Sequence, residues 1–143
     1  MISKFITAYA QQHYFLAEQG IAQAKKDGAN YWYIDGSLPE EYPENWSNQR
    51  ITSLVQQIQT YDIKPVFHGN FKLPLSSDVL EVREMAVKKV LSEIDLSAEL
   101  SAPLIIHGGA IVEPRLVIKA KKEALDNYLR SLDIIVSYAE KKT

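Results

Sequence analysis

Two stretches of the chain share one pattern of apolar and polar positions. PVFHGN occupies residues 65–70 and PLIIHGG occupies residues 103–109, so in both a proline and an unbroken apolar run precede a histidine and a glycine. A short apolar run without alternation is typical of a strand buried on both faces, as parallel sheets require. Ligands of α/β folds bind at the carboxyl ends of such strands. The pattern therefore predicts two parallel strands, each ending in a histidine at the same edge of a sheet.

The remaining apolar periodicity predicts alternating strands and helices. Two further strands are expected at residues 5–10 and 31–34, and helices at 13–27, 47–61, about 80–98 and 119–141. Asp78 and Glu81 have the spacing of a capping box at the start of the third helix, and the alternative is that Glu81 reinforces the first turn of that helix. The apolar stripe of the last helix contains Leu125, Leu129 and Val136. Strand and helix thus alternate four times, which favours a parallel α/β fold whose right-handed crossovers place all strand C-termini on one face.

The longest irregular segment, residues 37–48, follows the second predicted strand. It contains Pro39, Pro43 and Trp46. Two interpretations remain open at this point. One is a surface loop pinned by Trp46, and the other is a lid or substrate-contacting loop over the face where the strands end.

Composition narrows the class of protein. The 143 residues are 46% hydrophobic and 24% charged, which suits one globular domain spanning residues 1–143. The formal net charge of −2 makes nucleic acid an unlikely partner. No apolar run approaches the roughly 18 residues of a membrane span, and no signal peptide is recognisable. The chain has no cysteine, which excludes disulfides and thiolate metal sites. A cytoplasmic protein is expected.

Three polar residues follow predicted strands and are the candidate catalytic residues. His68 and His107 carry imidazoles that can move protons or bind a metal. Asp35 ends the second strand, where its carboxylate would orient a histidine, accept a substrate hydroxyl, or simply close a turn before Gly36. The histidines also have a structural interpretation, hydrogen bonding within a packed sheet edge. Two histidines without a carboxylate make a poor zinc site, because catalytic zinc normally has three protein ligands.

Further residues are expected to line the same edge and contact substrate. They are Tyr9 on the first strand, Asn70 after His68, and Glu113 in the loop after the fourth strand. For Glu113 a solvated loop carboxylate is the favoured interpretation, and Arg83 is expected to pair with glutamates on its own helix.

Several motifs, taken in order, resemble the xylose-isomerase-like TIM barrels. They are FHG at 67–69, LSS at 75–77, Arg83, AELSAP at 98–103 and LIIHGG at 104–109. The resemblance is best over residues 31–135, with Ser101 where that family usually has a glycine. The superfamily includes sugar-phosphate isomerases and epimerases and the endonuclease IV type of abasic-site nuclease.

The resemblance implies half of a (β/α)8 barrel, since a complete barrel needs eight βα units and about 250 residues. It implies a sugar or sugar-phosphate isomerase or epimerase that uses a divalent metal (Mn, Zn or Mg) once the barrel is completed. Positions matching His68 and His107 bind zinc in the endonuclease branch and tend to face substrate in the sugar branch. The family's later metal ligands, including a fifth-strand glutamate, are not in this sequence.

Half a barrel would expose open sheet edges, so a homodimer or a second half-barrel is the expected partner, beside a sugar or sugar phosphate. The alternative function is a non-catalytic half-barrel that serves as a binding or assembly module with a degenerate site.

Overall fold

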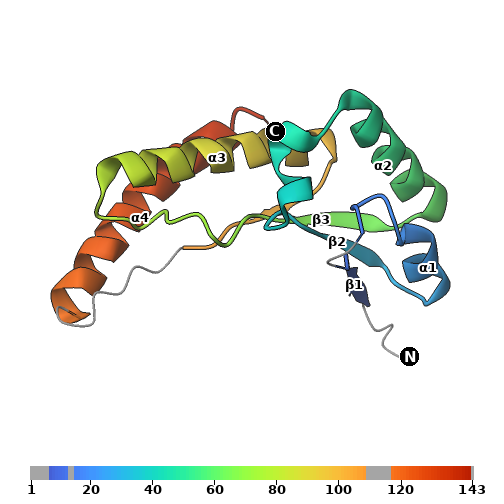
Figure 1. The fold of residues 1–143 in the computed structure, drawn as a ribbon, viewed down its shortest axis with the longest axis horizontal. Coiled ribbons are helices and arrows are strands. Elements are labelled where there is room, and N and C mark those ends of the chain that lie inside the picture. The colour runs from blue at the N-terminus through green and yellow to red at the C-terminus, as the bar shows by residue number, and fades with distance from the viewer. Residues whose placement is uncertain (1–6, 13–14, 109–116, 143) are drawn as a thin grey trace.

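The computed structural model describes residues 7–12, 15–108 and 117–142, and shows one parallel sheet with the strand order β1-β2-β3-β4. The strands are β1 (Ala8–Ala10), β2 (Tyr31–Asp35), β3 (Lys64–His68) and β4 (Leu104–Ile105). The α-helices are α1 (Ile21–Lys26), α2 (Asn48–Tyr61), α3 (Leu80–Glu99) and α4 (Val117–Ala139). The predicted alternation of parallel strands and helices is therefore observed (Figure 1).

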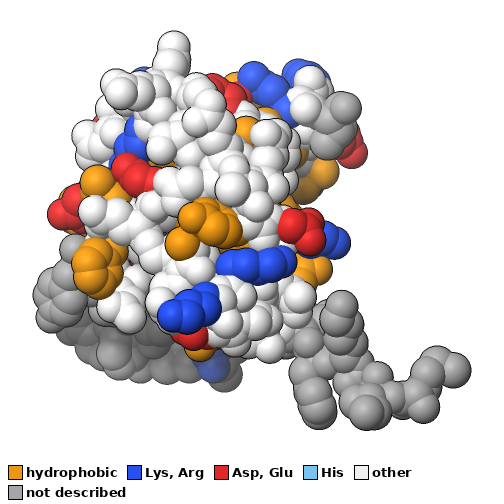
Figure 2. Space-filling model, turned by 90° about the vertical axis from the view of Figure 1, so that its right-hand side faces the viewer, with side chains coloured by type: hydrophobic (Ala, Val, Ile, Leu, Met, Phe, Trp, Pro, Cys, Tyr) orange, Lys and Arg blue, Asp and Glu red, His pale blue; other side chains and the backbone are white. Residues whose placement is uncertain are grey.

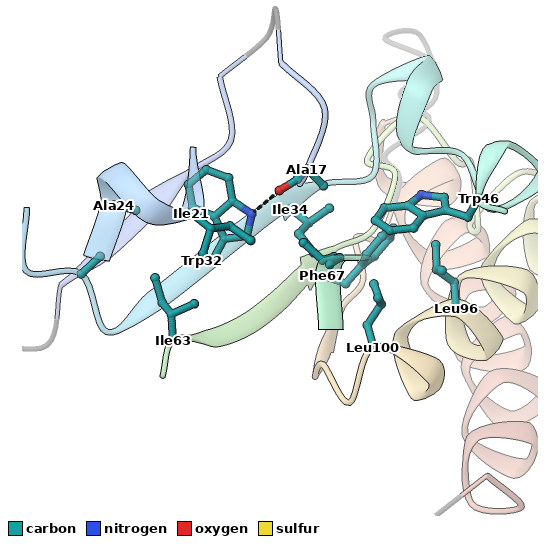
Figure 3. Close-up of a cluster of buried hydrophobic side chains, with 12 residues drawn as sticks. Ala17, Ile21, Ala24, Trp32, Ile34, Trp46, Ile63, Phe67, Leu96 and Leu100 are labelled. Atoms are coloured by element: carbon teal, nitrogen blue, oxygen red, sulfur yellow. Dashed lines mark hydrogen bonds between the residues drawn. The ribbon is translucent and has the colours of Figure 1, made fainter. Parts of the chain in front are cut away.

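Strand alternation gives the sheet one face packed on helices and one face left for the site. Trp32 and Ile34 of β2 and Phe67 of β3 are buried, whereas their neighbours along the strands are only half-buried. The buried set packs against Ala17, residues of α1 and α2, Leu96 of α3, and Leu100 directly after α3 (Figure 3). The indole of Trp32 donates from Nε1 to the Ala17 carbonyl at 2.9 Å, so its polar atom is satisfied inside this core. The opposite face, called the inner face below, carries Tyr33, Asp35 and His68.

The first helix is shorter than the 13–27 predicted, because α1 begins only at Ile21. Gly20 precedes it with a φ of +96°, a left-handed conformation that a helix cannot continue through. The backbone of Ala17 bonds to tertiary partners instead of to a helix: its N–H donates to Glu41 Oε1 at 2.9 Å and its carbonyl accepts from Trp32. The spacing of small residues here resembles the apolar stripe of a helix. The tertiary hydrogen bonds of Ala17 instead favour a non-helical backbone before Gly20.

The capping box predicted for α3 is wrong, whereas the alternative is observed, because Glu81 lies in the first turn of the helix. The N-cap is Val79, which has no side-chain cap, and the Val79 N–H is instead satisfied by Ser77 Oγ at 3.2 Å. Arg83 donates from Nη1 to the Ser77 carbonyl and so stabilises this same turn. In this hydrogen bond its partner is a backbone carbonyl and not the glutamate of its own helix that was expected. A compact turn over residues 75–79 thus takes the place of the Asp78–Glu81 box.

The last helix packs through fewer residues than its stripe predicts. Ile135 is buried against α3 and the Ser131 hydroxyl donates to the Leu75 carbonyl at 2.7 Å, whereas Leu125, Leu129 and Val136 are about half exposed. No helix of the described segments is long and apolar enough to cross a membrane.

Residues 37–48 form a pinned loop containing two short 3-10 helices, η1 (Pro39–Glu41) and η2 (Pro43–Asn45). Glu41 is fully buried and accepts two hydrogen bonds from Arg50 Nη2, at 2.6 and 2.8 Å. Trp46 donates to the Glu41 carbonyl at 3.2 Å, and the Arg50 guanidinium lies 4.1 Å from the Trp46 ring centroid. The segment therefore has its own polar core, which agrees with the pinned-loop interpretation.

The surface on the side of α1 and α2 shows Lys and Arg side chains interspersed with Asp and Glu (Figure 2). The face in this view has no continuous basic stripe of the kind that binds phosphate backbones.

Candidate functional site

The two histidines predicted as a pair touch each other on the inner face. The Nε2 atoms of His68 and His107 lie 2.6 Å apart, and their rings meet edge to face with centroids 4.5 Å apart. His68 pairs in register with Ile105, so His107 lies two residues further along its strand direction. A stagger of two keeps both side chains on the same face, whereas a stagger of one would have sent His107 to the helix layer. The two imidazoles therefore meet diagonally across the two-residue offset between the strands.

Asp35 and Tyr33 flank His68 from the neighbouring strand. Asp35 pairs in register with His68, and its Oδ1 lies 3.8 Å from His68 Nδ1, within ion-pair range but beyond a hydrogen bond. The same oxygen accepts the Ser37 N–H at 3.0 Å, so the carboxylate also closes the turn after β2. Tyr33 lies two residues earlier on the same face and stacks on His68, with ring centroids 4.7 Å apart.

The surroundings of His68 favour its neutral imidazole. Burial lowers the pKa of His68 below its usual value, the neighbouring His107 lowers it further, and the Asp35 carboxylate opposes both effects. Burial, together with the charge of Asp35, raises the pKa of Tyr33. Two nitrogens 2.6 Å apart have room for one proton between them, so one imidazole donates and the other accepts.

The glycine after His68 is required by close packing. A Cβ on Gly69 would lie 2.8 Å from Glu93 Oε2 and 2.8 Å from the Ile105 carbonyl oxygen. Gly36, after Asp35, is equally crowded, since a Cβ there would lie 2.7 Å from the Phe67 ring. The glycines after β2 and β3 thus let the chain turn in close contact with atoms of neighbouring segments. These turns bring the polar residues of adjacent strands together.

Beneath the turn after β3 lies a buried carboxyl that the sequence analysis did not select. Glu93 of α3 is 2% exposed, and its Oε1 accepts the Asn70 N–H at 2.9 Å. Its Oε2 is buried and has no hydrogen-bond partner among the residues that the structure describes. Burial raises the pKa of Glu93 to about 7, against the opposing effects of the Asn70 hydrogen bond and of Lys89. A signal existed in the sequence, because Glu93 interrupts the apolar face made by Val90 and its neighbours.

The predicted substrate contacts do not all join the histidines. Tyr9 pairs in register with Trp32, whose side chain faces the helices, and it lines a cavity of about 460 Å³ with residues of α1. Asn70 is next to the pair in sequence, but its Oδ1 accepts the Lys72 N–H at 2.9 Å and so closes a local turn. Glu113 lies outside the described residues. The position of Tyr9 follows from the alternation of side chains along the strands. Tyr9 shares the face of Trp32, whereas Tyr33 and Asp35 lie on the opposite face.

Two aromatic neighbours of the pair were missed. Tyr33 could have been found, because it precedes Asp35 by two residues and alternation puts both on one face. Phe71 is 53% exposed with its ring centroid 6.4 Å from that of His107. The position of Phe71 depends on the turn after β3, where the Phe71 N–H donates to Ser37 Oγ at 3.4 Å. No pattern in the sequence predicts that contact.

The described residues do not by themselves make a metal centre. Two imidazole nitrogens on one zinc ion at the usual 2.0–2.1 Å would be roughly 3.3 Å apart, so the pair would have to open to share a metal. Asp35 faces Nδ1 of His68, on the far side of the ring from the shared point. Within the described segments no group of three or more His, Asp or Glu side chains is placed to hold an ion. The geometry is that of a hydrogen-bonded imidazole pair.

The fold and the site define a class, an α/β barrel half with polar residues at the carboxyl ends of its strands. A family model for the xylose isomerase-like TIM barrel matches residues 21–143. The chain therefore belongs to the xylose isomerase-like TIM barrel family, and the resemblance seen in its motifs is confirmed. A search of curated proteins found no match.

Solved structures with the same fold are sugar epimerases or their relatives. A D-tagatose 3-epimerase-like protein matches with a TM-score of 0.77 and 22% identity, over 96% of this chain and 50% of that one. D-psicose 3-epimerase from Clostridium cellulolyticum H10, in a structure with D-tagatose, matches with 0.72 and 14%, over 96% and 50%. E. coli 3-keto-D-glucoside 4-epimerase matches with 0.73 and 15%, over 96% and 53%. The chain spans about half the length of these structures, which confirms the predicted half-barrel fold.

Proposed function

We propose that this chain forms one half of a sugar isomerase or epimerase type of site and binds a sugar or sugar phosphate at the inner face. The observation that carries the proposal is the contact between His68 and His107 at the ends of adjacent strands, with Asp35 beside them. Family membership supports the substrate class, because the solved structures with this fold are described as sugar epimerases.

The imidazole pair can move a proton at a substrate hydroxyl or at carbon next to a carbonyl. His68 is close to neutral at physiological pH because burial and His107 lower its pKa, and a neutral imidazole is a competent general base. Asp35 would stabilise the imidazolium that forms when His68 accepts a proton. Phe71 offers an exposed aromatic face next to His107, where the apolar face of a sugar ring can rest.

Metal assistance enters the proposal only through a completing half. A divalent ion (Mn, Zn or Mg) would polarise a carbonyl or hydroxyl of the sugar. Its carboxylate ligands would have to come from outside the described residues, so we derive no step through it.

We propose that the completing half is a second copy of the chain. Both outer strands of the sheet, β1 and β4, are edges. A groove of about 520 Å³ lies between α3, β4 and α4, with Leu104, Ile106, Ile135 and Val136 among its lining residues. A cavity of about 460 Å³ adjoins β1 on the helix side, with Phe15 and Trp32 among its lining residues. Pairing β4 of one copy with β1 of the other would cover both edges and close eight strands.

Light scattering combined with size-exclusion chromatography tests the association. The expected result is a dimer at micromolar concentration that Val136→Asp weakens at least tenfold. Leu125→Asp is the matched control, because Leu125 is as exposed on the same helix but does not line the groove. A wild-type monomer at that concentration, or equal weakening by both variants, would contradict the proposed dimer.

Sugar binding is tested by titrating the wild type, at a known oligomeric state, with D-tagatose, D-psicose and D-fructose 6-phosphate while recording imidazole NMR signals. Binding of any of them should shift the His68 and His107 signals, and His68→Ala and His107→Ala should each weaken it at least tenfold. Leu125→Ala should leave binding unchanged, because Leu125 is exposed on α4 and does not line the groove. A folded wild type that responds to none of these sugars would favour the alternative, a non-catalytic binding or assembly module.

A further inference from the structure

We propose that Glu93 is a positioning residue: from α3 its carboxyl holds the turn of residues 68–70 and thereby keeps His68 in contact with His107. The inference rests on the proposed function only for the use it gives this pair, and it stands on contacts of the described residues.

The first observation is the path of the contact. Glu93 is a helix residue with 2% exposure, and its Oε1 accepts the backbone N–H of Asn70 at 2.9 Å. Asn70 is two residues after His68, at the point where the chain leaves the sheet. The Glu93 carboxyl therefore satisfies the first backbone donor beyond Gly69 and fixes the direction in which the strand ends.

The second observation is that the neighbouring atoms surround the carboxyl closely. Glu93 Oε2 lies where a Cβ on Gly69 would contact it at 2.8 Å, next to the Ile105 carbonyl that accepts the Gly69 N–H. Gly69 thus sits between α3 and β4. The carboxyl therefore contacts the turn that follows His68, and the same turn is hydrogen-bonded through Gly69 to β4, which leads to His107 two residues after Ile105.

The third observation is that one oxygen of the buried carboxyl lacks a hydrogen bond, which a residue used only for core packing would avoid. Oε2 is buried and finds no hydrogen-bond partner within the described segments, and a buried polar atom of this kind costs stability. An apolar residue would pack between Val90 and Ile94 without that cost. A carboxyl here is explained by what it does for the turn above it.

Ser97 provides a matched control on the same helix. It is also a buried polar residue, one turn further along α3, but its hydroxyl bonds only within the helix, to the carbonyls of Glu93 and Ile94. Loss of the Ser97 hydroxyl should affect packing of α3 without touching the turn.

The experiment compares the wild type with Glu93→Ala, Glu93→Gln and Ser97→Ala by NMR, without any sugar present. Glu93→Ala should speed hydrogen exchange of the Asn70 amide about tenfold, the value of one typical hydrogen bond, and weaken the NOE between the two imidazole rings. Glu93→Gln keeps an acceptor and should change that exchange by less than about threefold. Ser97→Ala should leave both the exchange and the NOE as in the wild type.

The wild type gives an independent readout if Glu93→Ala does not fold. The Asn70 amide proton shift should follow the titration of the Glu93 carboxyl carbon, because a carboxylate attracts a donor more strongly than a carboxylic acid. An Asn70 shift that ignores this titration, or a folded Glu93→Ala protein with unchanged Asn70 exchange and ring NOE, would overturn the inference. A sample that binds no sugar yet shows these changes would refute the proposed function and leave the role of Glu93 intact.

Discussion

The buried carboxyl of Glu93 makes the stability of this protein depend on pH in a direction opposite to that of most acidic residues. Its pKa is about 7 in the folded chain, compared with 4.5 for an unperturbed glutamate. Between these values the folded state binds the proton and the unfolded state does not, so the free energy of unfolding falls as pH rises. The contribution is fully present below pH 4.5 and is lost as pH rises through 7.

Replacing Glu93 with Gln removes this titration and keeps the shape. At about 1.36 kcal/mol per pKa unit, the 4.5-to-7 shift corresponds to about 2.5 kcal/mol between pH 5 and pH 8. The unfolding free energy of Glu93→Gln should therefore rise by about that amount relative to the wild type over this range. Taking the difference between the two proteins cancels His68, whose lowered pKa makes stability rise with pH up to its unfolded value.

Urea unfolding at pH 5, 6, 7 and 8, in one buffer of constant ionic strength, measures this difference. The range lies above the region where Glu44 and Asp95, with lowered pKa values, lose their own contributions. A difference between the two proteins that stays constant within about 0.5 kcal/mol across the range would refute the reasoning, because Glu93 would then have the same pKa folded and unfolded.

Three packing predictions can be checked by the same urea measurements at pH 7. Gly69→Ala should destabilise by about 1–3 kcal/mol because the methyl meets fixed backbone, whereas Gly108→Ala, whose methyl makes an ordinary 3.5 Å contact, should stay within about 0.5 kcal/mol; equal effects would exclude close packing as the cause. Arg50→Met should cost about 3–5 kcal/mol by leaving the buried Glu41 carboxylate unpaired, and a neutral result would mean that another group compensates it. Leu54→Ala should cost about 2–5 kcal/mol, since its side chain is fully buried, and a loss under 1 kcal/mol would contradict that burial.

Local patterns in the sequence predicted the strands and the family of this protein. The apolar runs ending in His68 and His107 correctly predicted two parallel strands and their shared edge. The predicted burial of both faces is wrong for β4, where Ile105 is 43% exposed because the inner face of the half-barrel is uncovered. The motifs around them were also enough to identify the family and the half-barrel, which the family model and the solved structures confirm.

What the sequence could not determine is which of two faces each residue reaches, and which carboxyl lies beneath the site. Tyr9 lies on the helix side because its register with Trp32 sets its parity, and register is a property of two strands together. Likewise His68 and His107 meet because the offset between β3 and β4 is two residues. Glu93 reaches Asn70 across sequence positions that no periodicity connects, since only the packing of α3 on the sheet brings them together. Periodicity is local and fixes elements, whereas contacts between elements depend on register and packing, which the tertiary structure alone supplies.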